Sequence, residues 1–196
     1  TSDIRKFYEV PNKIQLANLG SSLGKYSFDF SQYPEITAFN FSMPQQYLEL
    51  DKSILLQYLQ CMDSDSIMLI IVGMINCDSI PSKTCVEDVE KKYYQFLEKK
   101  LIPQPTLFKY YFTKSVSNEN IVLRFSDKSP QDQYETAKSA SIKCFEPFPR
   151  KGEMGLNYNK KLIDDLIAIC KDNKIKPVIV TPPLTKVFYD FLVKED

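Results

Sequence analysis

Residues Ile14 to Gly24 read IQLANLGSSLG, an apolar run followed at once by a glycine-serine turn. The run is bounded by turn residues and lacks the polar alternation of a half-exposed strand, so it predicts a buried β-strand that ends at Leu19. The chain has only 5 glycines in 196 residues, and two of them, Gly20 and Gly24, flank the serine pair. Two interpretations stay open: the turn serves packing and capping alone, or it presents a hydroxyl at the edge of the fold for chemistry.

Further apolar runs extend this pattern along the chain. They are ITAFNFS (36–42), IMLIIV (67–72) and PVIVT (177–181). Runs of this kind fit strands covered on both faces, as in a parallel sheet. Because helical segments alternate with them, they predict βαβ units with right-handed crossovers. The expected fold class is α/β, a three-layer α/β/α arrangement around a mainly parallel sheet, in a single domain over residues 1–196.

The helical segments are indicated by apolar residues three and four positions apart. Residues 47–61 and residues 159–174 both carry such a stripe, with charged residues opposite in the second. Residues 77–157 interrupt the alternation. No linker composition marks the ends of this stretch, so we expect a largely helical insertion between two sheet strands, not a second domain. Within it, residues 86–102 and 132–143 predict helices.

Charge and hydropathy bound the classes of function. Lys+Arg and Asp+Glu are balanced at 25 each, which does not favour nucleic acid as a partner. The longest apolar stretch, IMLIIVGMI, is shorter than the roughly 18 residues of a membrane span. The first residues do not read as a signal peptide, which leaves an upstream signal or anchor open.

The residues available for metal binding and catalysis are also limited. The 5 cysteines have no CxxC spacing, which favours buried free thiols over a zinc site. A disulfide between Cys77 and Cys85 stays an alternative, and no metal or cofactor is expected. The chain contains no histidine, so a Ser-His-Asp site cannot be completed from these residues alone.

Polar residues follow the predicted strands at the carboxyl ends, where functional groups gather in open α/β sheets. These candidates are Gly20, Ser21 and Ser22 after the first strand, Asn40, Ser42 and Gln45 after the second, and Asn76 after the third. A serine beside free backbone N–H groups and an asparagine amide are suited to binding an oxyanion. Each segment also fits an ordinary polar turn.

The order of these elements resembles the SGNH/GDSL hydrolase superfamily, in particular its bacterial extracytoplasmic branch related to DltD-like and polysaccharide O-acyl-handling proteins. Gly20, Ser22 and Leu23 match the Gly-Asp-Ser-Leu block of that family, with Ser21 in the aspartate position. The resemblance implies an SGNH- or flavodoxin-like fold, Ser22 as the nucleophile with its own N–H in the oxyanion hole, and Asn76 as a further oxyanion donor. The strand KPVIVTPP (176–183) is similar to the one that precedes the last block of the family.

The sequence departs from the family pattern at two blocks. NFSMPQQ (40–46) has no glycine where the family supplies a second oxyanion donor, and no Asp-x-x-His follows the last strand. Either the closing strand and catalytic loop lie beyond residue 196, or the chain is a complete but degenerate relative. A lysine is a further alternative as the base, although the lysines of this chain read as surface residues.

The resemblance therefore implies a serine esterase or acyltransferase acting on O-acyl groups of a cell-surface glycan or on a small ester, with an extracytoplasmic location. The alternative is an inactive SGNH-like module that binds a glycan or a partner protein, with the aromatic stretches KKYYQF (91–96) and LFKYYF (107–112) as its contact surface. The oligomeric state is left undefined by the sequence.

Overall fold

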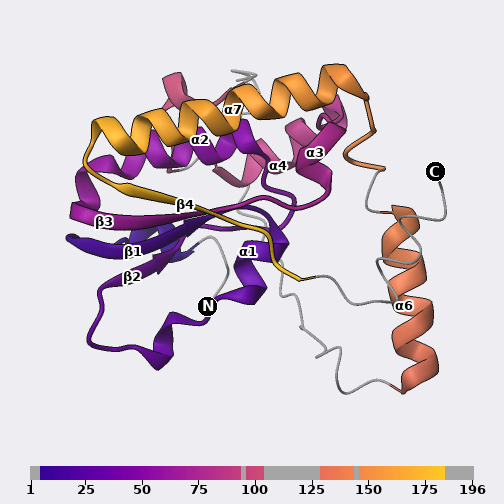
Figure 1. The fold of residues 1–196 in the computed structure, drawn as a ribbon, viewed down its shortest axis with the longest axis horizontal. Coiled ribbons are helices and arrows are strands. Elements are labelled where there is room, and N and C mark those ends of the chain that lie inside the picture. Colours follow the sequence, from indigo (N-terminus) through magenta and orange to yellow (C-terminus); the bar gives the residue numbers. More distant parts are fainter. Residues whose placement is uncertain (1–4, 94–95, 104–128, 144–145, 184–196) are drawn as a thin grey trace.

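The centre of the protein is a four-stranded parallel sheet, seen in a computed structural model that describes residues 5–93, 96–103, 129–143 and 146–183. The strands are β1 (Ile14–Leu19), β2 (Ala38–Asn40), β3 (Met62–Ile71) and β4 (Lys176–Val180). Their order across the sheet is β2-β1-β3-β4 (Figure 1). The α/β fold class predicted from the sequence is confirmed.

Helices of different lengths connect these strands. The α-helices are α1 (Ser22–Ser27), α2 (Leu48–Tyr58), α3 (Ile75–Asp78), α4 (Lys83–Tyr93), α6 (Pro130–Lys143) and α7 (Glu153–Asp172). The 3₁₀ helices are η1 (Arg5–Tyr8), η2 (Phe30–Gln32), η3 (Leu59–Cys61) and η4 (Lys99–Leu101). The described elements between β3 and β4 are all helical, apart from a single bridge between Ser79 and Arg150, as expected for the insertion.

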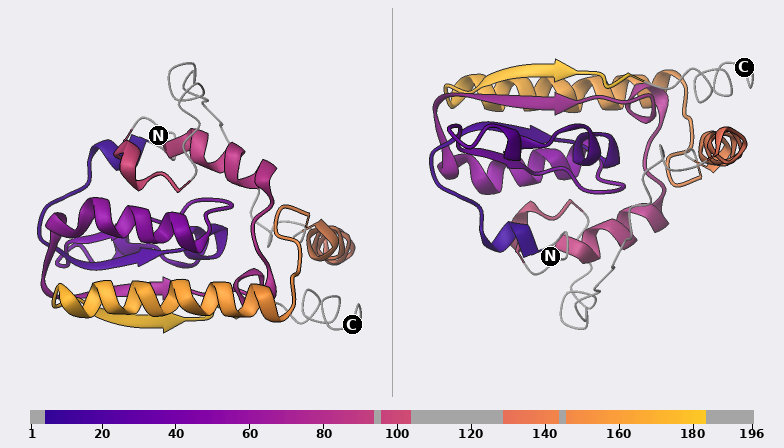
Figure 2. Two further views of the ribbon diagram at one scale, coloured as in Figure 1. Left: turned by 90° about the horizontal axis from the view of Figure 1, so that it is seen from above. Right: turned by 90° about the horizontal axis from the view of Figure 1, so that it is seen from below.

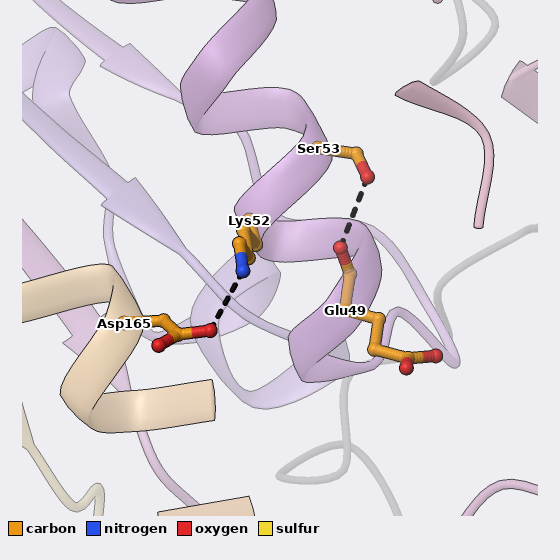
Figure 3. Close-up of polar contacts among 4 residues, drawn as sticks. All are labelled: Glu49, Lys52, Ser53 and Asp165. Atoms are coloured by element: carbon orange, nitrogen blue, oxygen red, sulfur yellow. Dashed lines mark hydrogen bonds and ion pairs between the residues drawn. The ribbon is translucent and has the colours of Figure 1, made fainter. Parts of the chain in front are cut away.

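Helices α2 and α7 lie side by side on one face of the sheet (Figure 2). In α7, Leu162, Leu166 and Cys170 recur every four residues and are buried, which is the stripe that a helix needs to pack on a sheet. An ion pair of 2.6 Å between Lys52 of α2 and Asp165 of α7 bridges the two helices (Figure 3).

Helix α1 lies on the opposite face, over the carboxyl ends of β1 and β3. Gly24 of α1 sits directly above the side chains of Ser42 and Ile71, so closely that no Cβ would fit there. Further from this end the same face is less covered: Ile67 of β3 is 38% exposed and Val178 of β4 is 42% exposed. The expectation of strands buried on both faces is therefore wrong for this part of the sheet, because α1 is too short to reach it.

An aromatic cluster closes the β2 side of the fold. Phe7 of η1 stacks on Phe96 with ring centroids 4.6 Å apart, and Tyr93 of α4 meets Phe7 edge-on at 5.8 Å. A tight turn from the Tyr93 carbonyl to the Phe96 N–H brings these two rings together. The single helix predicted over 86–102 is wrong for this reason, since α4 ends at Tyr93. The rings of the 91–96 stretch that the structure describes are thus core residues, and the 107–112 stretch lies outside the described residues.

The remaining sequence predictions differ from the structure mainly at boundaries. The strand predicted over 36–42 is confined to Ala38–Asn40, and the one predicted over 67–72 begins earlier, at Met62. Cys77 and Cys85 are both free, so the alternative of a disulfide between them is wrong, and Cys77 is exposed. Cys61, Cys85 and Cys170 are buried free thiols, as expected, and Cys144 lies outside the described residues.

Candidate functional site

The strand order places a topological switch point at the carboxyl ends of β1 and β3. From β1 the chain crosses to β2 on one side, whereas from β3 it crosses to β4 on the other side. The loops that follow β1 and β3 therefore diverge to opposite faces, and open α/β sheets bind ligands at this point. In this chain the two loops are the Gly20–Ser22 turn and the Gly73–Asn76 turn.

Gly20 fixes the course of the first loop. Its φ is +139°, a backbone conformation that favours glycine. A Cβ at this position would lie 2.7 Å from the Cβ of Ile71. The carbonyl of Gly20 accepts a hydrogen bond of 3.1 Å from the Met43 N–H, so the turn is also tied to the loop after β2. The glycine is therefore required by packing, whatever chemistry follows it.

The two serines next to Gly20 have different environments. Ser21 is 9% exposed and is the residue before α1, but its side chain makes no capping hydrogen bond. Its carbonyl accepts from the Lys25 N–H at 3.1 Å. Ser22 begins α1, is half-buried, and its hydroxyl makes no hydrogen bond to any residue that the structure describes. Of the pair, Ser22 has the hydroxyl available to a ligand.

Asn76 lies on the second loop with a fixed orientation. Its Oδ1 accepts a hydrogen bond of 2.9 Å from the Gly73 N–H. This leaves the Nδ2 group, which donates to no other residue in the described ranges. The side chain of Leu23, the residue after Ser22, lies against Gly73. The predicted Ser22 and Asn76 thus belong to two loops that touch.

Asn40 and Ser42, by contrast, hold α1 in place. The Nδ2 of Asn40 donates to the carbonyls of Gly24, Lys25 and Phe28 at 3.2 to 3.4 Å. Ser42 is fully buried, and its Oγ accepts from the Nδ2 of Asn18 at 2.7 Å. The polar side-chain groups of these two predicted binding residues are therefore hydrogen-bonded within the fold.

A lysine also contributes to this structural group. Lys6 of η1 donates from Nζ to the carbonyls of Asn40 and Ser42, at 2.6 and 2.8 Å. Both bonds are to the backbone at the end of β2. Lys6 therefore braces the β2 loop.

Gln45, a predicted binding residue, and its neighbour Gln46 have different environments. Gln45 is exposed with φ of +63°. Gln46 is buried and donates from Nε2 to the carboxyl of Asp51 at 2.5 Å. Burial raises the pKa of Asp51 to about 7, against the hydrogen bonds from Gln46 and from the Gly20 backbone, which favour its ionised form.

Asp51 and Asn18 are the residues of this region that the sequence reasoning missed. A signal for Asp51 was present, because it falls three residues after Leu48 and four before Leu55, on the apolar stripe of α2. Asn18 is the polar residue within the apolar run of β1. In both cases a polar side chain at a position expected to be buried indicates a hydrogen-bonded partner.

A small pocket opens beside Asn76 on the face that carries α2 and α7. Apolar side chains form most of its wall, and Ser79 and Asn159 contribute polar groups. The Nδ2 of Asn159 donates to the Ser79 carbonyl at 2.7 Å, while the Ser79 hydroxyl is buried without a partner among the described residues. The pocket adjoins the second loop, and it is too small to enclose a sugar ring.

The site has no metal-binding group around it in the described part of the chain. Among those residues there is no cluster of cysteine and acidic side chains suited to holding a metal ion, and none of the described helices is both long and apolar enough to cross a membrane. Comparison of the chain with family models, with curated proteins and with solved structures finds no match. Any assignment of function therefore rests on the geometry of the site.

Proposed function

We propose that the switch point at the ends of β1 and β3 is an acyl-transfer site of SGNH type. In this proposal Ser22 is the nucleophile toward an O-acyl ester, such as one carried by a glycan. The observation that carries this proposal is the free hydroxyl of Ser22, half-buried on the loop after β1 with no hydrogen bond to the described residues. A serine without a structural hydrogen bond at a topological switch point is available for reaction.

The proposed oxyanion donors lie on both loops. The Nδ2 of Asn76 is held in place through the bond between its Oδ1 and Gly73 N–H. The backbone N–H of Ser22 is in the first turn of α1, where amides have no partner within the helix. Removing one such donor from an established site typically costs about 10²- to 10³-fold in rate.

The reaction needs a base, and the 196 residues contain no histidine to serve as one. Oγ of Ser22 attacks the ester carbonyl carbon while its proton passes to a base, and the same base then protonates the departing alkoxide. The acyl group leaves Ser22 in a second step, to water or to an acceptor hydroxyl. Because the chain has no histidine, we assign the role of base to a histidine outside this sequence.

Chemical rescue tests this assignment directly. The purified chain is treated with a fluorophosphonate probe, with and without added imidazole as a substitute base, and labelled residues are mapped by mass spectrometry. We expect labelling at Ser22 that increases with imidazole and is lost in Ser22→Ala. Ser21→Ala, a change in the same turn, should retain it. A folded chain that shows no labelling at Ser22 under either condition would refute the proposal.

A second function, ligand binding without turnover, is favoured by one observation. The chain lacks histidine, and the amides of Asn18 and Asn40 both donate to the Gly24 carbonyl of α1, so few polar groups remain at the switch point for chemistry. An unreactive Ser22 together with saturable binding of an O-acetylated oligosaccharide, measured by calorimetry against the deacetylated form, would favour this module.

A further inference from the structure

A chain of buried polar groups lies beneath the Gly20–Ser22 loop. Tyr93 of α4 donates from its hydroxyl to Oε1 of Gln46 at 2.5 Å, and Gln46 donates from Nε2 to Oδ1 of Asp51 at 2.5 Å. The Gln46 N–H donates to the Met43 carbonyl at 3.1 Å, and the Met43 N–H donates to the Gly20 carbonyl at 3.1 Å. The Gly20 backbone also favours the ionised form of Asp51. Asp51, Gln46 and Tyr93 are each at most 2% exposed. The polar chain thus runs from α4 through α2 to the backbone of the site loop.

Among the residues that the structure describes, the titratable groups recorded next to this polar network are an acid, Glu90, and a phenol, Tyr47. From α4, Glu90 lies one turn before Tyr93 and accepts from the Tyr47 hydroxyl at 3.0 Å. Burial raises the pKa of Tyr93, and the negative charge of Asp51 raises it further. Of the partners that the structure records for Asp51, none is a lysine or arginine. A carboxyl group in this setting gains little by ionising, which is why burial dominates its pKa.

Gly20, at the end of this network, lies two residues before Ser22 in the same turn. Gly20 cannot relax freely, because Ile71 blocks one side of its Cα and the Met43 N–H holds its carbonyl. A change in the bond between Asp51 and Gln46 therefore reaches the Gly20 carbonyl through the backbone bonds of Gln46 and Met43, and from there the adjoining Ser21 peptide and the start of α1. An ionised Asp51 carboxylate accepts the Gln46 amide through a charge-assisted bond, and a protonated carboxyl accepts it more weakly.

We propose that Asp51 is a positioning residue whose protonation state sets the conformation of the Gly20–Ser22 loop, so that the exposure of the Ser22 hydroxyl changes with pH. The effect on Ser22 reactivity rests on the proposed acyl-transfer function, whereas the coupling of Asp51 to the loop does not.

Amide NMR of the whole chain separates the two parts of this inference. We expect the Gly20, Ser21 and Ser22 amide resonances to titrate together, with a midpoint at a pH of about 7. Asp51→Asn should abolish the titration, while Asp165→Asn, which removes a carboxylate from the surface of α7, should leave it unchanged. Absence of the titration in the natural chain, or its persistence in Asp51→Asn, would overturn the proposal.

A second variant covers the case in which Asp51→Asn does not fold. Tyr93→Phe removes the hydroxyl that supports Gln46, so the ionised carboxylate loses stabilisation and the midpoint should move to higher pH. An unchanged midpoint in folded Tyr93→Phe contradicts the network.

Fluorophosphonate labelling of Ser22 across the same pH range, with imidazole present, then reports reactivity. A change in labelling rate with the midpoint of the Gly20 amide supports the full inference. If the amide resonances titrate but Ser22 is not labelled at any pH, the role of Asp51 is supported and only the acyl-transfer function is refuted. Labelling whose pH dependence is the same in Asp51→Asn refutes the control of Ser22 by Asp51.

Discussion

Leu23 packs directly onto Gly73, so the loop after β1 and the loop after β3 are in contact. A Cβ on Gly73 would lie 2.6 Å from Cδ1 of Leu23. We predict that Gly73→Ala lowers the free energy of unfolding by about 0.5 to 1 kcal/mol, measured by urea denaturation, because the end of the flexible Leu23 side chain can shift and relieve most of the overpacking.

A double-mutant cycle identifies the cause of that loss. In a Leu23→Ala background the methyl group added at position 73 has room, so Gly73→Ala should cost less than half as much. An equal cost in both backgrounds would show that the glycine is needed for another reason.

The amide of Asn40 is predicted to be the main support of α1. Asn40→Ala removes the amide that donates to the carbonyls of Gly24, Lys25 and Phe28 and accepts from the Ser42 N–H. We expect a loss of about 2 to 3 kcal/mol in the free energy of unfolding. Asn173→Ala removes an exposed amide that bonds only the Ile169 carbonyl, and it should cost less than about 1 kcal/mol. Similar losses for the two variants would contradict this role.

Burial of Asp51 gives the stability a specific pH dependence. Its pKa is raised from the usual value of 3.8 to about 7, so the folded protein binds this proton more tightly than the unfolded chain does. The resulting stabilisation is complete below a pH of about 4 and is lost as the pH rises through about 7, by an amount on the order of a few kcal/mol. Chemical denaturation of Asp51→Asn across this range should lack the decline, and a parallel decline in both proteins would exclude Asp51 as its source.

The ion pair between Lys52 and Asp165 is predicted to contribute little. Both side chains are 35% exposed, and solvent screens such pairs. In a cycle of Lys52→Met and Asp165→Asn we expect a coupling below about 1 kcal/mol that decreases as salt is added. A larger coupling that is insensitive to salt would mean that the pair is shielded from water.

Thiol accessibility provides a test of the packing. Cys77 is exposed, whereas Cys61, Cys85 and Cys170 are buried, and burial raises the pKa of the Cys170 thiol to about 11. Maleimide labelling of the native chain, mapped by mass spectrometry, should modify Cys77 fastest of these four. Denaturant should equalise the rates, and faster native modification of Cys170 would contradict the packing of α7.

The sheet could be predicted where local sequence decides the structure. The apolar run Ile14–Leu19 is bounded by turn residues, and the observed strand has the same limits. The start of β3 could not be predicted in this way, because residues 62–66 are mostly polar and become a strand through pairing with β1, as in the Ile14 to Met62 bridge. Long-range pairing of this kind leaves no periodicity in the sequence.

The candidate site was predictable in position but not in the use of each side chain. Parallel strands bring Ser22 and Asn76 to one edge, which the element order implies. Whether Asn40 faces a ligand or the carbonyls of α1 depends on how α1 packs, and that depends on the close approach of Gly24 to Ser42. The burial of Asp51 could be predicted only from the position of its charged side chain within the apolar stripe of α2.

The sheet order has a consequence for synthesis on the ribosome. The elements β1, β2, α2 and β3 all lie before residue 72, but α7 and β4 arrive only after α6 has been made. Until then, a nascent chain exposes the apolar flank of β3 that β4 and α7 will cover. Contacts this distant in sequence slow folding, so a chaperone that shields this flank during translation would raise the yield of native protein more than one supplied after release.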